Sequence, residues 1–83
     1  MKYTIRGLKE GLWYEVVVIN DESEDINEII SGGKVVASFE IGWSNRKGKF
    51  VVKKLIFNKR DLSTTEKNKI FTLIKDFVES LNL

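Results

Sequence analysis

The sequence predicts an α+β fold, in which a four-stranded, mostly antiparallel sheet carries one long helix on one face. Two patterns lead to this prediction. Residues 1–57 contain four stretches rich in β-branched and aromatic residues, separated by turn-forming residues, which is typical of strands. Residues 63–81 place apolar side chains at helical spacing behind a capping signal. The element order is therefore ββ-α-ββ-α, and the 83 residues are expected to form a single domain, residues 1–83, around one modest core.

The first two predicted strands form an amino-terminal hairpin. Residues 1–6 alternate apolar and polar side chains, which indicates a half-buried strand. Residues 7–11 are predicted to form a turn, because they begin and end with glycines that tolerate positive φ. Residues 12–20 are apolar on both faces apart from Glu15, which is typical of a central strand covered on both sides.

The connection over residues 21–33 is acidic and has two interpretations. In the first, Ser23 caps a short helix over residues 24–31, whose early carboxylates are favoured by the helix dipole and which ends before Gly32. In the second, the connection is a long loop. A calcium-binding loop is excluded, because the positions that need glycine and a bidentate glutamate hold Ile26 and Gly32.

Residues 34–43 and 50–57 are expected to form a second hairpin. The first of these stretches alternates strictly, with its larger apolar side chains on one face. The intervening residues 44–49 form a short loop, in which Gly48 can supply the left-handed residue that ends a tight turn.

The register of the fourth strand stays open. One residue of slip decides whether Lys53 or Lys54 shares the core face. In either register Glu40 lies opposite a lysine, which is a favourable cross-strand pair.

The long helix is expected to cover one face of the sheet. Ser63 and Glu66 form a capping box at its start, and the apolar side chains that follow span an arc of roughly 160°. The other sheet face still contains apolar side chains, including Trp13, Val17 and Ile19. Either the short acidic helix covers that face, or it meets a protein partner or a second copy in a homodimer.

Charge is distributed unevenly along the chain. The formal net charge is only +2, yet residues 10–28 contain acidic residues and no basic ones, whereas residues 43–60 contain basic residues and no acidic ones. Lysines and arginines bind phosphate backbones with release of counterions, and Trp43 flanks the hairpin tip, where it can stack on an unpaired base. The alternative interpretation is a solvated surface whose lysines protect an edge strand. The candidate nucleic-acid-binding residues are Trp43, Arg46, Lys47, Lys49, Lys53, Lys54, Lys59 and Arg60.

A second hypothesis is a protein-interaction module, of the kind that phages and mobile elements use to inhibit or adapt a host protein. Trp13 and Tyr14 are neighbours in one strand, so they point to opposite faces, and one of them is left under the short helix or at an interface. The acidic segment would dock on a basic partner surface. The candidate interface residues are Trp13, Asp21, Glu22, Glu24, Asp25 and Glu28.

The composition argues against catalysis and metal binding. The 83 residues include no cysteine and no histidine, which removes thiolates, the commonest zinc ligand and the usual general base. The remaining residues form no catalytic constellation, so we expect a protein that is not an enzyme and has neither a metal site nor a cofactor. No run approaches the roughly 18 apolar residues of a membrane span, and a small domain without disulfides is typically intracellular, so we expect a cytoplasmic protein without a membrane partner.

Overall fold

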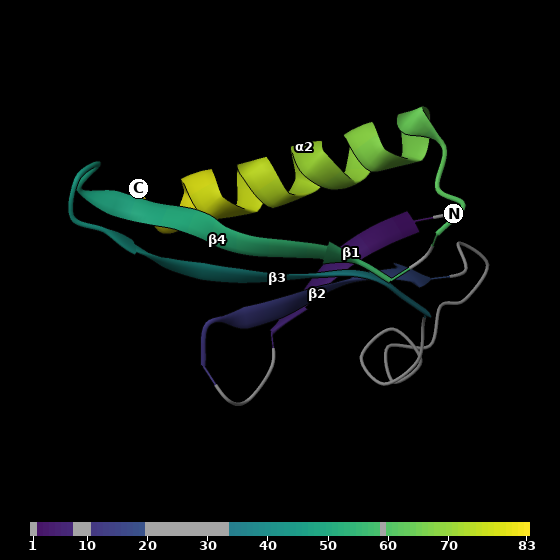
Figure 1. Ribbon diagram of the computed structural model, residues 1–83, viewed down its shortest axis with the longest axis horizontal. Helices are drawn as coiled ribbons and strands as arrows, with labels where there is room; N and C mark the ends of the chain where they lie inside the picture. Colours follow the sequence, from purple (N-terminus) through teal and green to yellow (C-terminus); the bar gives the residue numbers. More distant parts are fainter. Residues whose placement is uncertain (1, 8–10, 20–33, 59) are drawn as a thin grey trace.

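The computed structural model describes residues 2–7, 11–19, 34–58 and 60–83 (Figure 1). Within these ranges, strands β1 (Lys2–Gly7), β2 (Trp13–Ile19), β3 (Lys34–Ser44) and β4 (Lys49–Phe57) precede the helix α2 (Thr64–Leu81). The four strands form one antiparallel sheet in the order β1-β2-β3-β4. The predicted α+β fold with a long carboxy-terminal helix is therefore confirmed. The short helix predicted over residues 24–31 lies outside the described residues.

The sheet places β2 and β3 at its centre and β1 and β4 at its edges. The central position of β2 agrees with the prediction from its two apolar faces. The predicted turn over residues 7–11 is wrong at its first residue, because Gly7 ends β1 and pairs with Tyr14. Of its two glycines, Gly11 has a positive φ, of 117°.

The core lies between the sheet and α2, which runs along one face (Figure 1). Phe39 and Ile70 are completely buried there. Tyr14, Phe39 and Phe77 form an aromatic triangle with ring centroids 5.5, 4.8 and 5.9 Å apart, which joins β2, β3 and α2. Offset and edge-to-face pairs of this kind stabilise a fold beyond their buried area.

The start of α2 confirms the predicted capping box. The hydroxyl oxygen of Ser63 accepts a hydrogen bond from the backbone N–H of Glu66 at 3.1 Å. The same hydroxyl donates to Glu66 Oε1 at 3.2 Å, so the two side chains hold each other in place. The helix therefore begins at Thr64 and directs its apolar face onto the sheet.

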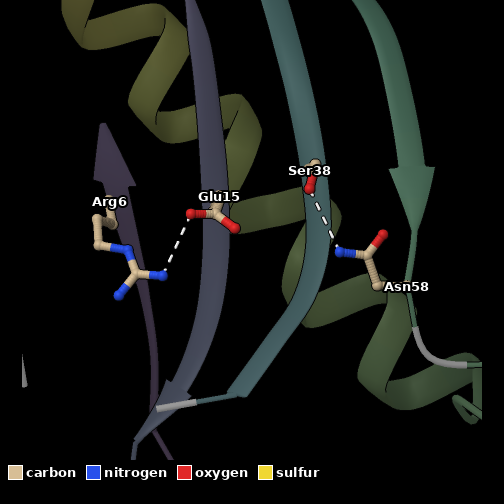
Figure 2. A network of polar contacts seen from close by, with 4 residues as sticks. All are labelled: Arg6, Glu15, Ser38 and Asn58. Carbon is tan, nitrogen blue, oxygen red and sulfur yellow. Dashed lines mark hydrogen bonds and ion pairs between the residues drawn. The ribbon is translucent and has the colours of Figure 1, made fainter. Parts of the chain in front are cut away.

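The face of the sheet opposite α2, called the open face below, is polar along its middle (Figure 2). Arg6 Nη2 forms a salt bridge with Glu15 Oε1 at 3.2 Å, and Asn58 Nδ2 donates to Ser38 Oγ at 3.3 Å. These four residues come from β1, β2, β3 and the end of β4 and thus cross the whole sheet.

The apolar residues expected on the open face are largely buried. Val17 is 0% exposed and Ile19 is 8% exposed, although neither belongs to the cluster under α2. Trp13, the third of them, is half-buried and pairs with Glu40 of β3. At Val17 and Ile19 the open face therefore offers no uncovered apolar surface to a partner.

Candidate nucleic-acid interface

The turn between β3 and β4 presents two of the predicted basic residues. Gly48 N–H donates to the carbonyl of Ser44 at 2.7 Å, and Lys47 N–H donates to the Ser44 hydroxyl at 3.2 Å. Gly48 has a φ of 64°, as the sequence predicts, because glycine adopts this conformation without steric cost. Arg46 and Lys47 are consequently exposed together at the tip of the hairpin.

A β-bulge in β4 lets both Lys53 and Lys54 face solvent. Glu40 pairs with Lys54 and Ile41 pairs with Val52, so Lys53 is an extra residue that no residue of β3 matches. Both lysines are exposed, and the expectation that one of them shares the core face is wrong. The predicted pairing of Glu40 with a lysine is confirmed.

The side chain of Lys53 lies on the open face. A Cβ atom built on Gly42 would come within 2.9 Å of Lys53 Cγ, so the aliphatic part of this lysine covers the glycine. Gly42 follows Ile41, which belongs to the core under α2, so a side chain at position 42 would point to the open face. The bulge thus directs Lys53 and Lys54 to the same side of the sheet.

Five exposed cations gather on the turn between β3 and β4 and on β4 itself, and they are called the hairpin cations below. Among the residues that the structure describes, none of the five forms an ion pair with a carboxylate. Unpaired cations leave their positive field available to a polyanion. The hairpin cations are Arg46, Lys47, Lys49, Lys53 and Lys54.

The two remaining predicted phosphate ligands do not join this group. Arg60 follows β4 at the end away from the turn, and a nine-residue strand such as β4 is about 30 Å long. Lys59 lies outside the described residues. The cluster of cations in the structure therefore contains fewer residues than the basic stretch of the sequence predicts.

Trp43 supplies the exposed aromatic ring that the sequence predicts beside the tip. Its side chain is 53% exposed. The indole packs edge-to-face on Phe50, with ring centroids 5.2 Å apart and an interplanar angle of 83°. This contact fixes the ring while leaving much of its surface open for stacking.

A groove between β4 and α2, called the edge groove below, was not expected from the sequence. Its volume is about 420 Å³. Within it, Phe71 is 45% exposed and Val52 is 39% exposed, which is unusual for large apolar side chains beside a core. The wide apolar arc of the helix is the signal that could have indicated it. The groove is lined by Lys47, Lys49, Phe50, Val51, Val52, Leu55, Phe71, Ile74, Lys75, Val78, Glu79 and Asn82.

Of the predicted protein-interface residues, Trp13 is the one that the structure describes. It pairs with Glu40 and lies on the open face, because it alternates along β2 with Glu15. The acidic candidates Asp21, Glu22, Glu24, Asp25 and Glu28 lie outside the described residues.

In the described residues no three carboxylates gather closely enough to hold a metal ion. Nor does any helix formed by those residues have the length and apolar character needed to cross a bilayer. Comparison of the chain with protein-family models, with curated proteins and with solved structures gives no match, so the assignment of a site depends on the residues of this chain alone.

Proposed function

We propose that this chain is a small, non-enzymatic, cytoplasmic nucleic-acid-binding module that holds phosphates with the hairpin cations. The observation that supports the proposal is the presence of five exposed cations on the β3–β4 turn and β4, without an ion pair in the described part of the chain. These side chains would displace the cations condensed on the phosphate backbone, with a gain in counterion entropy.

Protection of an edge strand explains only part of this group. Lysines on β4, such as Lys49, Lys53 and Lys54, would discourage pairing with another chain. Arg46 and Lys47 lie in the turn, where there is no strand edge to protect. The exposed ring of Trp43 also adds no protection, because a large exposed aromatic favours association. These three residues favour a binding surface.

A protein-interaction module, as a homodimer or as an adaptor of a host protein, is the weaker proposal. It relied on an uncovered apolar face, yet Val17 and Ile19 are buried. Salt-bridged and hydrogen-bonded side chains occupy the middle of the same face (Figure 2).

Titration of fluorescently labelled oligonucleotides at several salt concentrations tests the proposed function. If all five hairpin cations contact phosphates, log K should fall with log salt with a slope of about −4.5 for duplex and about −3.5 for single strands. The Arg46→Gln/Lys47→Gln variant should bind more weakly and with a shallower slope. Lys34→Gln/Lys69→Gln removes the same net charge from exposed positions outside the hairpin tip and is the matched control.

Two results would contradict the proposal. One is the absence of binding at low salt, or binding that does not respond to salt. The other is an equal loss of affinity in both double variants, which would mean that net charge, and not the hairpin tip, attracts the nucleic acid.

A further inference from the structure

We infer that the edge groove accommodates unstacked bases, so that the module prefers single-stranded to double-stranded nucleic acid. The inference depends on the proposed function, since the hairpin cations must first hold the phosphates. It adds a binding site for the base, through which the module discriminates between single-stranded and double-stranded nucleic acid.

The groove has the size and lining that a flat, apolar ligand needs. Its volume of about 420 Å³ lies within the range of about 300–1,000 Å³ that is usual for small-molecule sites. Phe50 and Phe71 contribute aromatic rings to it. Phe57 fixes Phe71 by an edge-to-face contact with centroids 5.6 Å apart, while Phe71 stays 45% exposed. An immobilised, open ring is a surface on which a base stacks.

Only an unpaired base can use such a surface. In a duplex both faces of each base are covered by its neighbours, whereas bases in single strands can turn outward and stack on protein side chains. The groove therefore discriminates by the accessibility of the base and not by base sequence.

The charges around the groove match the phosphates that accompany a base. Lys47, Lys49 and Lys75 line it, and Glu79 is the one carboxylate in the lining. Because Lys47 and Lys49 are also hairpin cations, a phosphate held by either of them brings its base to the groove. The apolar lining of the groove fits the base of a nucleotide, and the lysines fit its phosphate.

An acidic peptide is the other ligand that this combination suggests. A peptide that added a strand to the edge of β4 would need free backbone groups on that edge. At Phe50 both groups are already bonded, since the N–H donates to Asn82 Oδ1 at 2.8 Å and the carbonyl accepts from Asn82 Nδ2 at 3.0 Å. A stacking base requires neither group, so the geometry favours the nucleotide.

Binding of a twelve-nucleotide oligothymidylate should be compared with binding of a twelve-base-pair duplex at one low salt concentration. We expect the single strand to bind at least tenfold more tightly. Phe71→Ala should weaken single-strand binding by roughly tenfold, as expected for loss of one stacking contact, and leave duplex binding unchanged. Ile56→Ala is the matched control, because Ile56 is 48% exposed on β4, next to the groove, but does not line it.

Tryptophan fluorescence gives a readout that does not depend on the stability of the Phe71 variant. The chain has two tryptophans, so Trp13→Phe leaves Trp43 as the sole reporter beside Phe50. Its emission should be quenched by the single strand and not by the duplex.

The outcomes separate the inference from the proposed function. Equal affinity for both forms with a normal salt dependence, or an unchanged affinity of Phe71→Ala for the single strand, would overturn the inference and leave the proposed function standing. No binding of either form would overturn both. Tighter binding of a glutamate- and leucine-containing peptide, sensitive to Phe71→Ala, would assign the groove to a peptide and overturn the inference.

Discussion

The side-chain amide of Asn82 closes the edge of β4 at Phe50. Its Oδ1 accepts from the Phe50 N–H at 2.8 Å, and its Nδ2 donates to the Phe50 carbonyl at 3.0 Å. The same Nδ2 donates at 3.1 Å to the carbonyl of Val78, one of the last carbonyls of α2 that lack a partner within the helix. One side chain thus takes the place of a neighbouring strand and joins the end of the helix to the hairpin.

Replacement of this amide should destabilise the fold. Asn82→Ala is expected to lower the free energy of unfolding by about 1–2 kcal/mol, because exposed hydrogen bonds contribute about 0.5–1.5 kcal/mol each and the loss is partly repaired by water. Thermal unfolding should show a fall in Tm of about 4–8 °C for each kcal/mol.

Two further variants make the test specific to Asn82. Asn82→Asp keeps the acceptor, loses both donors and adds a negative charge at the carboxy-terminal end of the helix, so it should be at least as destabilised as the alanine variant. Asn58→Ala loses one side-chain hydrogen bond of 3.3 Å and should change Tm less. A smaller effect at Asn82 than at Asn58 would contradict the role assigned to the amide.

Local patterns in the sequence were sufficient to predict the strands, the bounds of α2 and the turn at Gly48. Each of these depends on residues close together in the chain, such as the Ser63–Glu66 capping box. The contact between Phe50 and Asn82 joins residues 32 positions apart, and no local rule selects that pair. The edge groove likewise depends on the spacing between a strand and a helix, which side-chain periodicity does not fix.

The bulge at Lys53 is a second feature that local sequence patterns do not predict, although the residues involved are closer together in the chain. Regular alternation allows only one of Lys53 and Lys54 to face away from the core. The extra residue lets both face solvent, and it is accommodated because Gly42 leaves room for the Lys53 side chain. The sequence contains both residues, but their pairing becomes evident only once the two strands are placed side by side.

Gly42 and Lys53 should therefore be energetically coupled. In the wild-type background Gly42→Ala should destabilise the fold, because the new Cβ would lie 2.9 Å from Lys53 Cγ and 3.0 Å from Lys53 Cε. In a Lys53→Ala background the same change should be neutral or stabilising by about 0.5 kcal/mol, since alanine restricts the unfolded chain.

Denaturant unfolding of the wild type, both single variants and the double variant measures this coupling. We expect an interaction energy of about 1 kcal/mol, within the range found for residues in direct contact. Additive effects of the two substitutions would show that Lys53 moves away from Gly42 without cost.

The capping box gives a third prediction. Ser63→Ala should lower the free energy of unfolding by about 1 kcal/mol, because it removes the acceptor of the Glu66 N–H. Ser63→Asp should preserve stability, since a carboxylate also caps a helix and is favoured by its dipole. Thr72→Ala, at an exposed position within the same helix, should be slightly stabilising because alanine is the better helix former. Equal stability of the Ser63→Ala variant and the wild type, measured by chemical unfolding, would argue that the helix start is held by packing alone.

Glu40 should weaken nucleic-acid binding through its position opposite Lys54. Lys54 pairs with Glu40 in the register, so part of its positive field is offset, whereas Lys53 at the bulge has no such neighbour. Glu40→Gln keeps the shape of the side chain and removes the negative charge. It should strengthen oligonucleotide binding by roughly two- to threefold at low salt. This is less than the factor of about five that corresponds to the roughly 1 kcal/mol between two unit charges about 4 Å apart in water, because Glu40 and Lys54, two residues that the structure describes, form no ion pair.

The dependence of this gain on salt and position distinguishes a local effect from a change in net charge. As salt rises and the Debye length falls from about 30 Å at 0.01 M to about 10 Å at 0.1 M, the gain from Glu40→Gln should shrink more slowly than that from a remote charge. Asp76→Asn removes one exposed carboxylate of α2 that does not line the edge groove, and it is the matched control. Binding curves for the two variants at both salt concentrations make the comparison.

An equal improvement of affinity by Asp76→Asn and Glu40→Gln at 0.1 M salt would contradict this prediction. It would mean that phosphates do not approach the open face of β4 and that the nucleic acid contacts only the hairpin tip and the edge groove.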